Sequence, residues 1–377
     1  MDSFNRRYDD LEKEFFPKRV LIVYGPRRVG KTFLLNQFLN RLTGRVLYRT
    51  GEDLELREIL ESQSVKKIQS AFSNYDYVVI DEAQKINQVG HGLKIAIDHL
   101  PDVRFIATGS SSFELAHQVG EPLTGRKIAL TLYPLSTFEL KKQLGGMEIL
   151  EDLDARLVFG SYPEIMKTPN PEQKAMLLKE LRDSYLYKDI LELDGIRNSR
   201  KINDLLSLIA YQVGKEVSLH ELGTQLGMDK RTVERYLDLL EKAFVLINVR
   251  GFSRNLRKEI TKTSRYYFLD NGVMNSVINN FNPVSMRGDK GTLWENFIFM
   301  ERLKFRAYTN LYANPYFWRT YDRQEIDLVE EHSGNLFGYE FKYAPTRKIS
   351  TPAAWKKAYP QAEFHVITRN NWLDFVS

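Results

Sequence analysis

A glycine-rich segment that ends in a lysine and a threonine is the strongest chemical signal in the sequence. It runs from Gly25 to Thr32 as GPRRVGKT and has the spacing G-x-x-x-x-G-K-T. The apolar run RVLIVY precedes it and the run FLLNQFL follows it, so we expect the segment to join a strand to a helix. The alternative is a glycine-rich turn that only opens an ordinary helix, and the two flanking patterns disfavour it.

This spacing suits the binding of a nucleoside triphosphate, and ATP is the cofactor that we expect. Glycines let backbone N–H groups turn toward phosphate oxygens, and the N-terminus of the following helix adds partial positive charge. Lys31 would neutralise the β- and γ-phosphates, and the Thr32 hydroxyl would ligate Mg²⁺. The residues that we expect to line the site are Gly25, Pro26, Arg27, Arg28, Val29, Gly30, Lys31, Thr32 and Phe33.

Two adjacent acids follow an apolar strand further along the chain. The strand is YVVI, and Asp81 and Glu82 come directly after it. Ligands of a parallel sheet bind at the carboxyl ends of its strands, so we expect Asp81 to hold the Mg²⁺ water shell. Glu82 would orient or deprotonate the attacking water. Alone, such a pair usually marks a solvated strand end, but the upstream phosphate loop favours the catalytic interpretation.

Two further polar positions are candidates for the same site. Ser110, with Thr108 behind it, follows the next apolar strand and could sense the γ-phosphate, although a serine-rich loop also serves as a turn. Arg126 precedes the fifth expected strand, and an arginine there could reach the nucleotide of a neighbouring subunit in a homo-oligomer. An ordinary surface arginine is an equal alternative.

A second group of charged residues lies near the end of the chain. Glu295 is on an expected helix, Asp327 is on a strand, and Glu340 and Lys342 share one face of the next strand, because strand side chains alternate. Carboxylates on adjacent strands suit Mg²⁺, and a lysine beside them can stabilise the charge that develops on a phosphodiester. The alternative is a set of buried ion pairs in a fold without catalysis.

The middle of the chain predicts a helix-turn-helix. Ser218 opens one helix, Gly227 ends it, and Asp229 caps a second helix that extends to Ala243. The residues expected on its outward face are Lys230, Arg231, Glu234, Arg235 and Asp238. A cationic segment follows, with Arg250, Arg254, Arg257, Lys258, Lys262 and Arg265. A basic wing of this kind would contact DNA phosphates, and the alternative is a winged helix used only for packing.

To position these candidate sites, the N-terminal part of the chain must form a parallel sheet and the part that follows must form helices. The strands that we expect in the first part are Arg19–Tyr24, Arg45–Thr50, Tyr75–Asp81, Val103–Thr108 and Lys127–Tyr133. Their alternation with helical patterns predicts an α/β domain with a parallel sheet, and the phosphate loop makes it a P-loop domain. The expected domains are a P-loop ATPase core (1–134), a helical lid or connector (135–200), a winged helix-turn-helix (201–285) and an α/β restriction-endonuclease-like domain (286–377).

Composition narrows the class of protein. The 377 residues include no cysteine, which excludes disulfides, cysteine nucleophiles and cysteine-ligated zinc. The sequence has neither an apolar run long enough for a membrane helix nor a secretory signal, so we expect a cytoplasmic protein without a membrane partner. A net charge of +5 permits an anionic partner without requiring one.

Taken together, the motifs resemble a family of archaeal and bacterial AAA-type P-loop ATPases with a winged helix and a C-terminal PD-(D/E)xK nuclease-like domain. GPRRVGKT, VVIDEAQ, ATGSSS and TGR carry the resemblance in the first part, and YPLSTFE, GSYPEI, LWENF, EIDLV and YEFKY extend it over nearly the full chain. The resemblance implies an AAA-type nucleotide site and an endonuclease-like tail. It does not establish that the members cut DNA.

The sequence therefore leads to one main hypothesis and two rivals. The main hypothesis is a Mg²⁺-dependent ATPase that couples its nucleotide cycle to DNA binding or processing, with a metal-dependent nuclease tail. The first rival is an ATP-switched DNA-binding or regulatory protein whose nuclease-like domain is inactive. The second is a small-molecule kinase, which the Asp81-Glu82 pair and the long additional modules disfavour.

Overall fold

The computed structural model describes residues 4–109, 122–184, 199–253, 264–344 and 349–377. These residues form two compact units. We call Asn5–Tyr133, with which Lys242–Phe244 are grouped, the N-terminal unit, and Pro134–Glu241 with Val245–Ser377 the C-terminal unit. Each is described on its own below.

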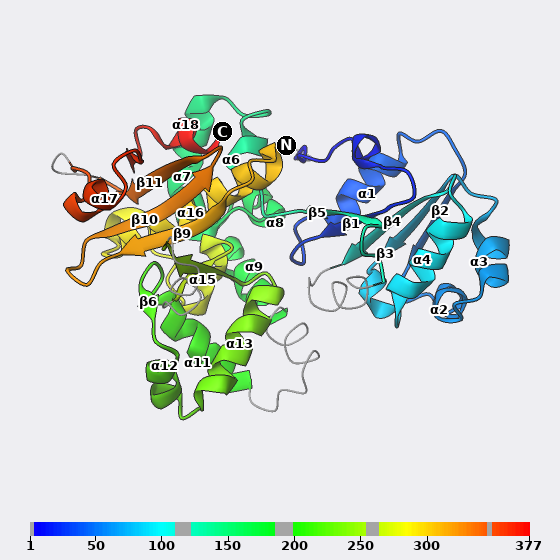
Figure 1. The fold of residues 1–377 in the computed structure, drawn as a ribbon, viewed down its shortest axis with the longest axis horizontal. Coiled ribbons are helices and arrows are strands. Elements are labelled where there is room, and N and C mark those ends of the chain that lie inside the picture. The colour runs from blue at the N-terminus through cyan, green and yellow to red at the C-terminus, as the bar shows by residue number, and fades with distance from the viewer. Residues whose placement is uncertain (1–3, 110–121, 185–198, 254–263, 345–348) are drawn as a thin grey trace. The chain divides into compact units, whose positions relative to one another are not determined.

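The N-terminal unit is built on a five-stranded parallel sheet in the order β2-β3-β4-β1-β5 (Figure 1). The expectation of a parallel α/β sheet is confirmed, and each expected strand is present within two residues at its ends. The strands are β1 (Val20–Tyr24), β2 (Val46–Thr50), β3 (Tyr77–Asp81), β4 (Arg104–Gly109) and β5 (Lys127–Thr131). Strands β1 and β3 are both fully buried, as central parallel strands are.

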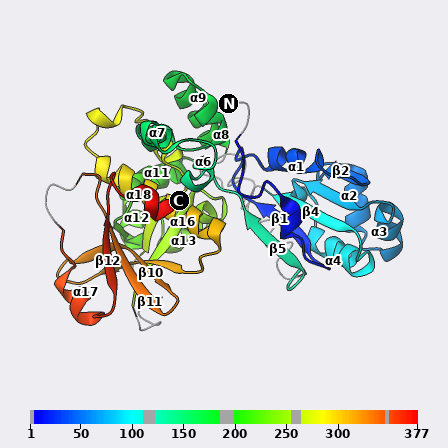
Figure 2. The ribbon, with the colours of Figure 1, turned by 90° about the horizontal axis from the view of Figure 1, so that it is seen from above.

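Helices cover both faces of this sheet. In two views α1 and α4 lie on opposite sides of the strands (Figures 1 and 2). The helices are η1 (Leu11–Glu14), α1 (Lys31–Leu39), α2 (Leu54–Glu61), α3 (Val65–Phe72), η2 (Ala83–Lys85) and α4 (Val89–His99). Asp53 and Ser64 begin α2 and α3 because their side chains accept the N–H groups of Leu56 and Lys67. Helices α2, α3 and α4 pack a common core against Ile22, Ile80 and their neighbours.

The C-terminal unit contains most of the helices. They are α6 (Thr137–Leu140), α7 (Gly146–Phe159), α8 (Pro163–Lys167), α9 (Pro171–Ser184), α11 (Ser199–Ala210), α12 (Leu219–Leu226), α13 (Lys230–Lys242), α15 (Asn271–Val277), η4 (Val284–Met286), α16 (Lys290–Thr309), α17 (Ala353–Ala358) and α18 (Trp372–Val376). Ser218 caps α12, and Gly227 ends it in the left-handed conformation that glycine favours, as the sequence predicts.

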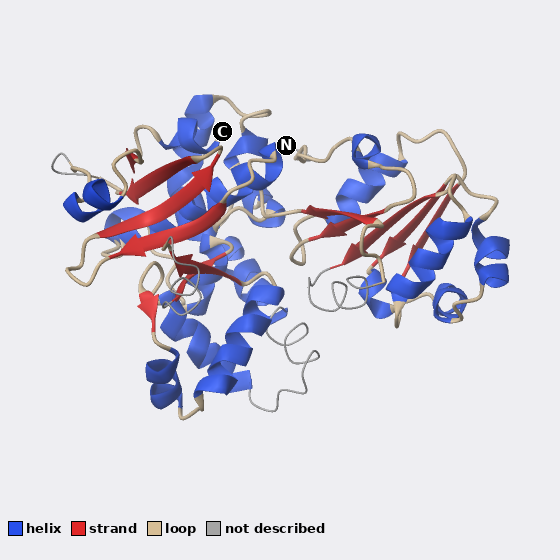
Figure 3. Cartoon of the chain, viewed as in Figure 1, coloured by secondary structure: helices blue, strands red, loops and turns tan. Residues whose placement is uncertain are grey.

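The strands of the C-terminal unit form one seven-stranded sheet in the order β12-β11-β10-β9-β7-β8-β6. Figure 3 draws the strands in red. They are β6 (Glu216–Val217), β7 (Leu246–Gly251), β8 (Ser264–Phe268), β9 (Asn314–Arg319), β10 (Glu325–His332), β11 (Asn335–Phe341) and β12 (Glu363–Ile367). Strand β7 pairs with β9 in parallel, so this sheet crosses the boundary that we expected between residues 285 and 286. The expected winged-helix and endonuclease-like segments therefore share one sheet, because backbone hydrogen bonds join them.

The GSYPEI motif has a structural explanation in this unit. Gly160 has a φ of +73°, and a Cβ there would lie 1.8 Å from Oδ1 of Asp270. Asp270 is buried and accepts the N–H groups of Ser161 at 2.7 Å and Gly272 at 2.8 Å. The carboxylate cannot move aside without losing these bonds, so only glycine fits at position 160.

Within the described ranges, no helix combines the length and the apolar character that a membrane span requires.

We predict that Gly160→Ala destabilises the C-terminal unit by about 2 kcal/mol or more, because it adds both a clash and a strained φ. The measurement is urea-induced unfolding. The control is Gly291→Ala, which lies in α16 where a Cβ would meet nothing within 4 Å, and it should cost no stability. Equal stability of the two variants would contradict this explanation.

Candidate nucleotide site and C-terminal charge cluster

The phosphate loop follows β1 and opens α1, with the backbone that its glycines permit. Gly25 has a φ of +148°, and a Cβ there would lie 2.2 Å from the carbonyl oxygen of Leu132. Gly30, the N-cap of α1, has a φ of +95°. The buried Lys31 donates from Nζ to the carbonyl oxygens of Gly25 and Pro26, both at 2.9 Å. The loop therefore closes around its own lysine at the N-terminus of α1. The lysine charge and the N–H groups at the helix N-terminus make this a favourable place for an anion.

The other expected loop residues differ in accessibility. Val29 is buried, Arg27 is half-buried, and Arg28 is exposed with a φ of +59°. Thr32 and Phe33 are exposed at the start of α1. The structure thus presents the loop and the first turn of α1 together at one end of the parallel sheet.

Asp81 is the centre of the site. It is buried at the end of β3, and Thr32 donates to its Oδ2 at 2.8 Å. Tyr48, on β2, donates to the same oxygen at 3.0 Å. Thr108, on β4, donates to Oδ1, which also accepts the backbone N–H of Glu82 at 3.2 Å. One carboxylate therefore joins three strands and the first turn of α1.

Glu82 follows Asp81 in a left-handed conformation, with a φ of +53°. This backbone turn directs the chain into η2, where Gln84 donates to the Glu82 carboxylate. The backbone N–H of Glu82 also donates to the Thr108 hydroxyl at 3.1 Å. The acid that we expect to activate water is thus fixed by its own loop and by β4.

The donor set fits Mg²⁺. A threonine hydroxyl and a carboxylate lie 2.8 Å apart beside the phosphate loop, and both are the hard oxygen ligands that Mg²⁺ prefers. Thr32 would hold the ion and Asp81 its water shell. Burial and the neighbouring Asp81 raise the pKa of Tyr48 to about 12, so its phenol remains a hydrogen-bond donor at neutral pH.

Three residues at this site were missed by sequence reasoning or given a secondary role. Tyr48 has no motif around it, and only the pairing of β2 with β3 brings it to Asp81. Arg6 is buried and donates to the carbonyl oxygens of Val29 and Tyr133, both at 2.5 Å, so a guanidinium braces the phosphate loop. Thr108, which we expected only behind Ser110, contacts Asp81 directly.

Two expected catalytic residues are not brought to the site by the described structure. Ser110 lies outside the described residues. Arg126 immediately precedes β5, at the end of the sheet opposite the phosphate loop, and its Nε lies 3.0 Å from Oδ1 of Asp98. Because of this position Arg126 cannot reach the phosphates of its own chain. A role in a neighbouring subunit stays a prediction.

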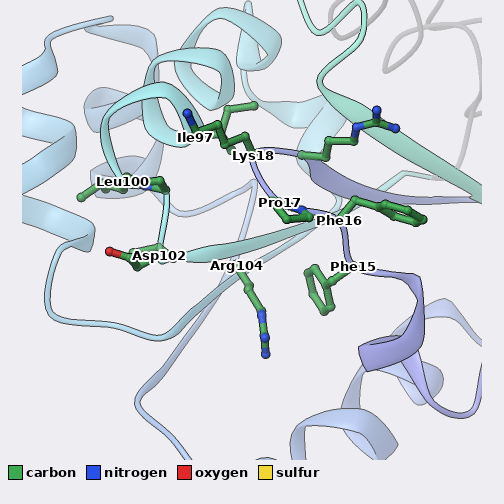
Figure 4. A pocket seen from close by; sticks show the side chains of 11 residues that line it. Phe15, Phe16, Pro17, Lys18, Ile97, Leu100, Asp102 and Arg104 are labelled. Carbon is green, nitrogen blue, oxygen red and sulfur yellow. The ribbon is translucent and has the colours of Figure 1, made fainter.

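A hollow of about 370 Å³ lies at that same opposite end of the sheet (Figure 4). Phe15, Phe16 and Arg104 are among the residues that line it, and they precede β1 or begin β4. The phosphate loop instead follows β1, so this hollow is separate from the nucleotide site.

The charged residues of the tail gather around α16, β8, β10 and β11. Glu340 and Lys342 form an ion pair with Oε1 and Nζ 2.5 Å apart. Asp327 accepts the backbone N–H of Phe341 at 2.8 Å, and Glu295 accepts the hydroxyl of Tyr267 at 2.9 Å. The structure thus brings together residues from all four elements, as the nuclease spacing suggests.

Arg265 changes the chemistry of this cluster. We expected it among the wing cations that meet DNA, and this expectation is wrong, because its side chain is buried. Its guanidinium contacts Glu325 at 2.8 Å and Asp327 at 3.7 Å and lies over the ring of Phe317. A fixed internal cation therefore occupies one side of the Asp327 carboxylate.

Metal binding by Glu295, Asp327 and Glu340 stays a prediction. Among the described residues, no three histidine, aspartate or glutamate side chains are close enough to hold a metal ion. Glu295, Asp327 and Glu340 are held instead by Tyr267, Arg265 and Lys342. Only Oε2 of Glu340 is left buried without a hydrogen-bond partner among them.

Burial dominates the electrostatics of the cluster. It raises the pKa of Glu295 to about 8, with help from the nearby charge of Asp327, and it raises the pKa of Asp327 as well. Burial and Asp327 raise the pKa of Glu340 to about 7, against the opposing effect of Lys342. Glu295 and Glu340 are therefore partly neutral near pH 7.

Known families match successive parts of the chain. Residues 17–141 match a family model described as an AAA domain. Residues 150–284 and 290–374 match two models, each described as a domain of unknown function (DUF8612 and DUF4143, respectively). The N-terminal unit is thus an AAA-type P-loop domain, which is the class that its sheet and site define.

Relatives occur in archaea and bacteria. An uncharacterised protein of Methanocaldococcus jannaschii is 26% identical over 93% of this chain and 80% of its own length. One of Mycobacterium tuberculosis is 28% identical over 88% of this chain and 72% of its own length. One of Haemophilus influenzae is 24% identical over 84% of this chain and 80% of its own length.

Two solved structures that resemble the chain have lower sequence identity. The Thermotoga maritima RuvB Holliday junction branch migration motor is 19% identical, with a TM-score of 0.31 over 65% of this chain and 87% of that chain. A signal transduction ATPase with numerous domains from Pyrococcus horikoshii is 13% identical, with a TM-score of 0.32 over 82% and 48%. The fold assignment does not depend on these likenesses.

We predict that Glu295→Gln removes a pH-dependent loss of stability. A carboxyl whose pKa rises from 4.5 to about 8 on folding is protonated in the folded state and ionised in the unfolded state between these values. The native chain should therefore lose stability relative to Glu295→Gln as pH rises from 4.5 to 8, and no further above 8. The measurement is the difference in melting temperature at pH 5.5, 7 and 8.5.

The control for this prediction is Glu331→Gln, at an exposed position of β10. Its melting-temperature difference should not vary with pH. If the melting-temperature difference between Glu295→Gln and the native chain does not change with pH, burial of Glu295 does not lower the stability of the native chain as pH rises.

Proposed function

We propose that the protein binds and hydrolyses ATP with Mg²⁺ at the phosphate loop and couples this cycle to DNA binding. The observation that carries the proposal is the hydrogen bond between Thr32 and Asp81 beside the Lys31 loop. It joins the end of β3 to the start of α1, and this is where a triphosphate and its metal need a phosphate cradle and oxygen ligands together.

Each residue then has a chemical role. Lys31 and the loop N–H groups bind the phosphates, and Thr32 with Asp81 holds Mg²⁺, which would neutralise charge on the transferring phosphoryl group. Glu82 orients and deprotonates the attacking water, and Gln84 and Thr108 hold Glu82 in place. Arg6 keeps the loop in shape through Val29.

The DNA part of the proposal rests on α12, α13 and the β7–β8 hairpin. The expected outward residues Lys230, Arg231, Glu234, Arg235 and Asp238 are all exposed on α13. The hairpin that follows carries the exposed Arg250, while Arg254, Arg257, Lys258 and Lys262 lie outside the described residues. A helix pair followed by a basic hairpin is the form of a winged helix, and such cations would meet backbone phosphates with salt-dependent affinity.

For the tail we favour a PD-(D/E)xK-like module that does not cleave. Arg265 and Lys342 already neutralise Asp327 and Glu340, and removing either cation from a buried carboxylate is costly. The rival is a metal-dependent nuclease, and one observation favours it. Oε2 of Glu340 is buried without a hydrogen-bond partner, as a metal ligand in a metal-free state would be.

We predict that Lys31→Ala abolishes ATP binding and lowers turnover about a hundredfold or more, because it removes the cation from the phosphates. Glu82→Gln should keep ATP binding and lower turnover by a factor of the same order. The measurement is ATP turnover with and without single- and double-stranded DNA, and DNA should increase native turnover.

The control for these substitutions is Lys67→Ala, at an exposed position of α3 away from the loop, which should behave as the native chain. Native turnover that is absent, or that Lys31→Ala leaves unchanged, would contradict the proposal. A requirement for a small acceptor molecule would favour a kinase instead.

We predict that supercoiled plasmid incubated with Mg²⁺ or Mn²⁺ shows no nicking that depends on Asp327. The native chain and Asp327→Ala should give the same products, because Arg265 and Lys342 occupy the carboxylates that a metal would need. Nicking by the native chain that Asp327→Ala abolishes would establish the nuclease and overturn this part of the proposal.

A further inference from the structure

The Asp81 carboxylate has its full set of hydrogen-bond donors from the protein alone. An ionised carboxylate has about four acceptor positions on its two oxygens. Thr108 and the Glu82 N–H occupy those of Oδ1, and Thr32 and Tyr48 occupy those of Oδ2. A water bound to Mg²⁺ can therefore hydrogen-bond to Asp81 only where one of these donors has left.

Three of the four donors are fixed in place. Thr108 is completely buried on β4, a strand with neighbours on both sides. The Glu82 N–H belongs to the backbone turn that leads into η2. Thr32 can give its hydroxyl oxygen to a metal while its hydrogen stays on Asp81, so it has no reason to leave.

Tyr48 is the donor that can leave. It lies on β2, the edge strand of the sheet, and its side chain is only half-buried. Its phenol reaches Asp81 at 3.0 Å, the longer of the two bonds to Oδ2. A rotation of this side chain would free one acceptor position of Oδ2 without moving the backbone.

We propose that the Tyr48 hydroxyl occupies the position of a metal-bound water and competes with it for Asp81, so that Tyr48 sets the affinity of the site for Mg²⁺. This inference rests on the proposed function, because it concerns the metal that accompanies ATP. Tyr48 is a positioning residue in this account, since it acts on the metal through Asp81 and touches no reacting atom. Metal binding then depends on loss of the hydrogen bond between Tyr48 and Asp81.

If Tyr48 competes with a metal-bound water, Tyr48→Phe should strengthen Mg²⁺ binding. If Tyr48 only supports Asp81, the same substitution should weaken it. The variant keeps the ring but loses the competing hydroxyl, so Mg²⁺ should bind about tenfold more tightly, as expected for one hydrogen bond to a charged group. A residue that merely holds Asp81 in place would instead weaken metal binding when its hydroxyl is removed. The sign of the change therefore distinguishes the two roles.

The test is calorimetric titration of the full chain with a non-hydrolysable ATP analogue, in EDTA and over a series of Mg²⁺ concentrations. Mn²⁺ binding in the presence of the analogue, followed by electron paramagnetic resonance, gives the metal affinity directly. For Tyr48→Phe we expect analogue affinity in EDTA within twofold of the native chain and Mn²⁺ affinity about tenfold higher.

The matched control is Tyr77→Phe. Tyr77 begins β3 at the end of the strand away from Asp81, and its hydroxyl donates to Glu12 at 3.0 Å. This variant should leave both affinities unchanged. Equal or weaker Mn²⁺ binding by Tyr48→Phe, with native analogue binding intact, would overturn the inference alone. Failure of the native chain to bind the analogue at all would overturn the proposed function and the inference with it.

Discussion

The hydrogen bonds of the Asp81 carboxylate are the constraint on which the N-terminal unit depends. They join β2, β3 and β4 to the first turn of α1 through Tyr48, Thr108 and Thr32. Strand β4 lies between β1 and β3, so Thr108 at its end can contact Asp81 at the end of β3. The hydrogen bonds of Asp81 therefore depend on the order of the strands in the sheet.

The C-terminal unit handles its buried carboxylates differently. Each acid of the tail cluster faces a cation or a phenol of the same unit, and Arg265 reaches Asp327 from β8, a strand that we had assigned to another module. The joined seven-stranded sheet makes this contact possible. The acids at nuclease spacing therefore face cations and a phenol from neighbouring parts of the same unit.

The sequence was sufficient for elements that repeat a simple physical pattern. The five parallel strands, the glycine-bearing loop and the caps of α12 follow from periodicity and turn chemistry within a few residues. It was insufficient where partners are far apart along the chain. Arg6, Tyr48 and the burial of Arg265 depend on which strands become neighbours, and no local pattern encodes that. The short strand β6 and helix α18 were also missed, because two and five residues give too little periodicity.

Isothermal titration of the native chain with ATP and Mg²⁺ tests the central claim most directly. The claim is that the N-terminal unit holds a triphosphate with its loop N–H groups and Lys31, beside a metal on Thr32 and Asp81. The account predicts saturable heat with one nucleotide per chain and tighter binding when Mg²⁺ is present. No heat from adenine or guanine nucleotides, on folded protein, would contradict it.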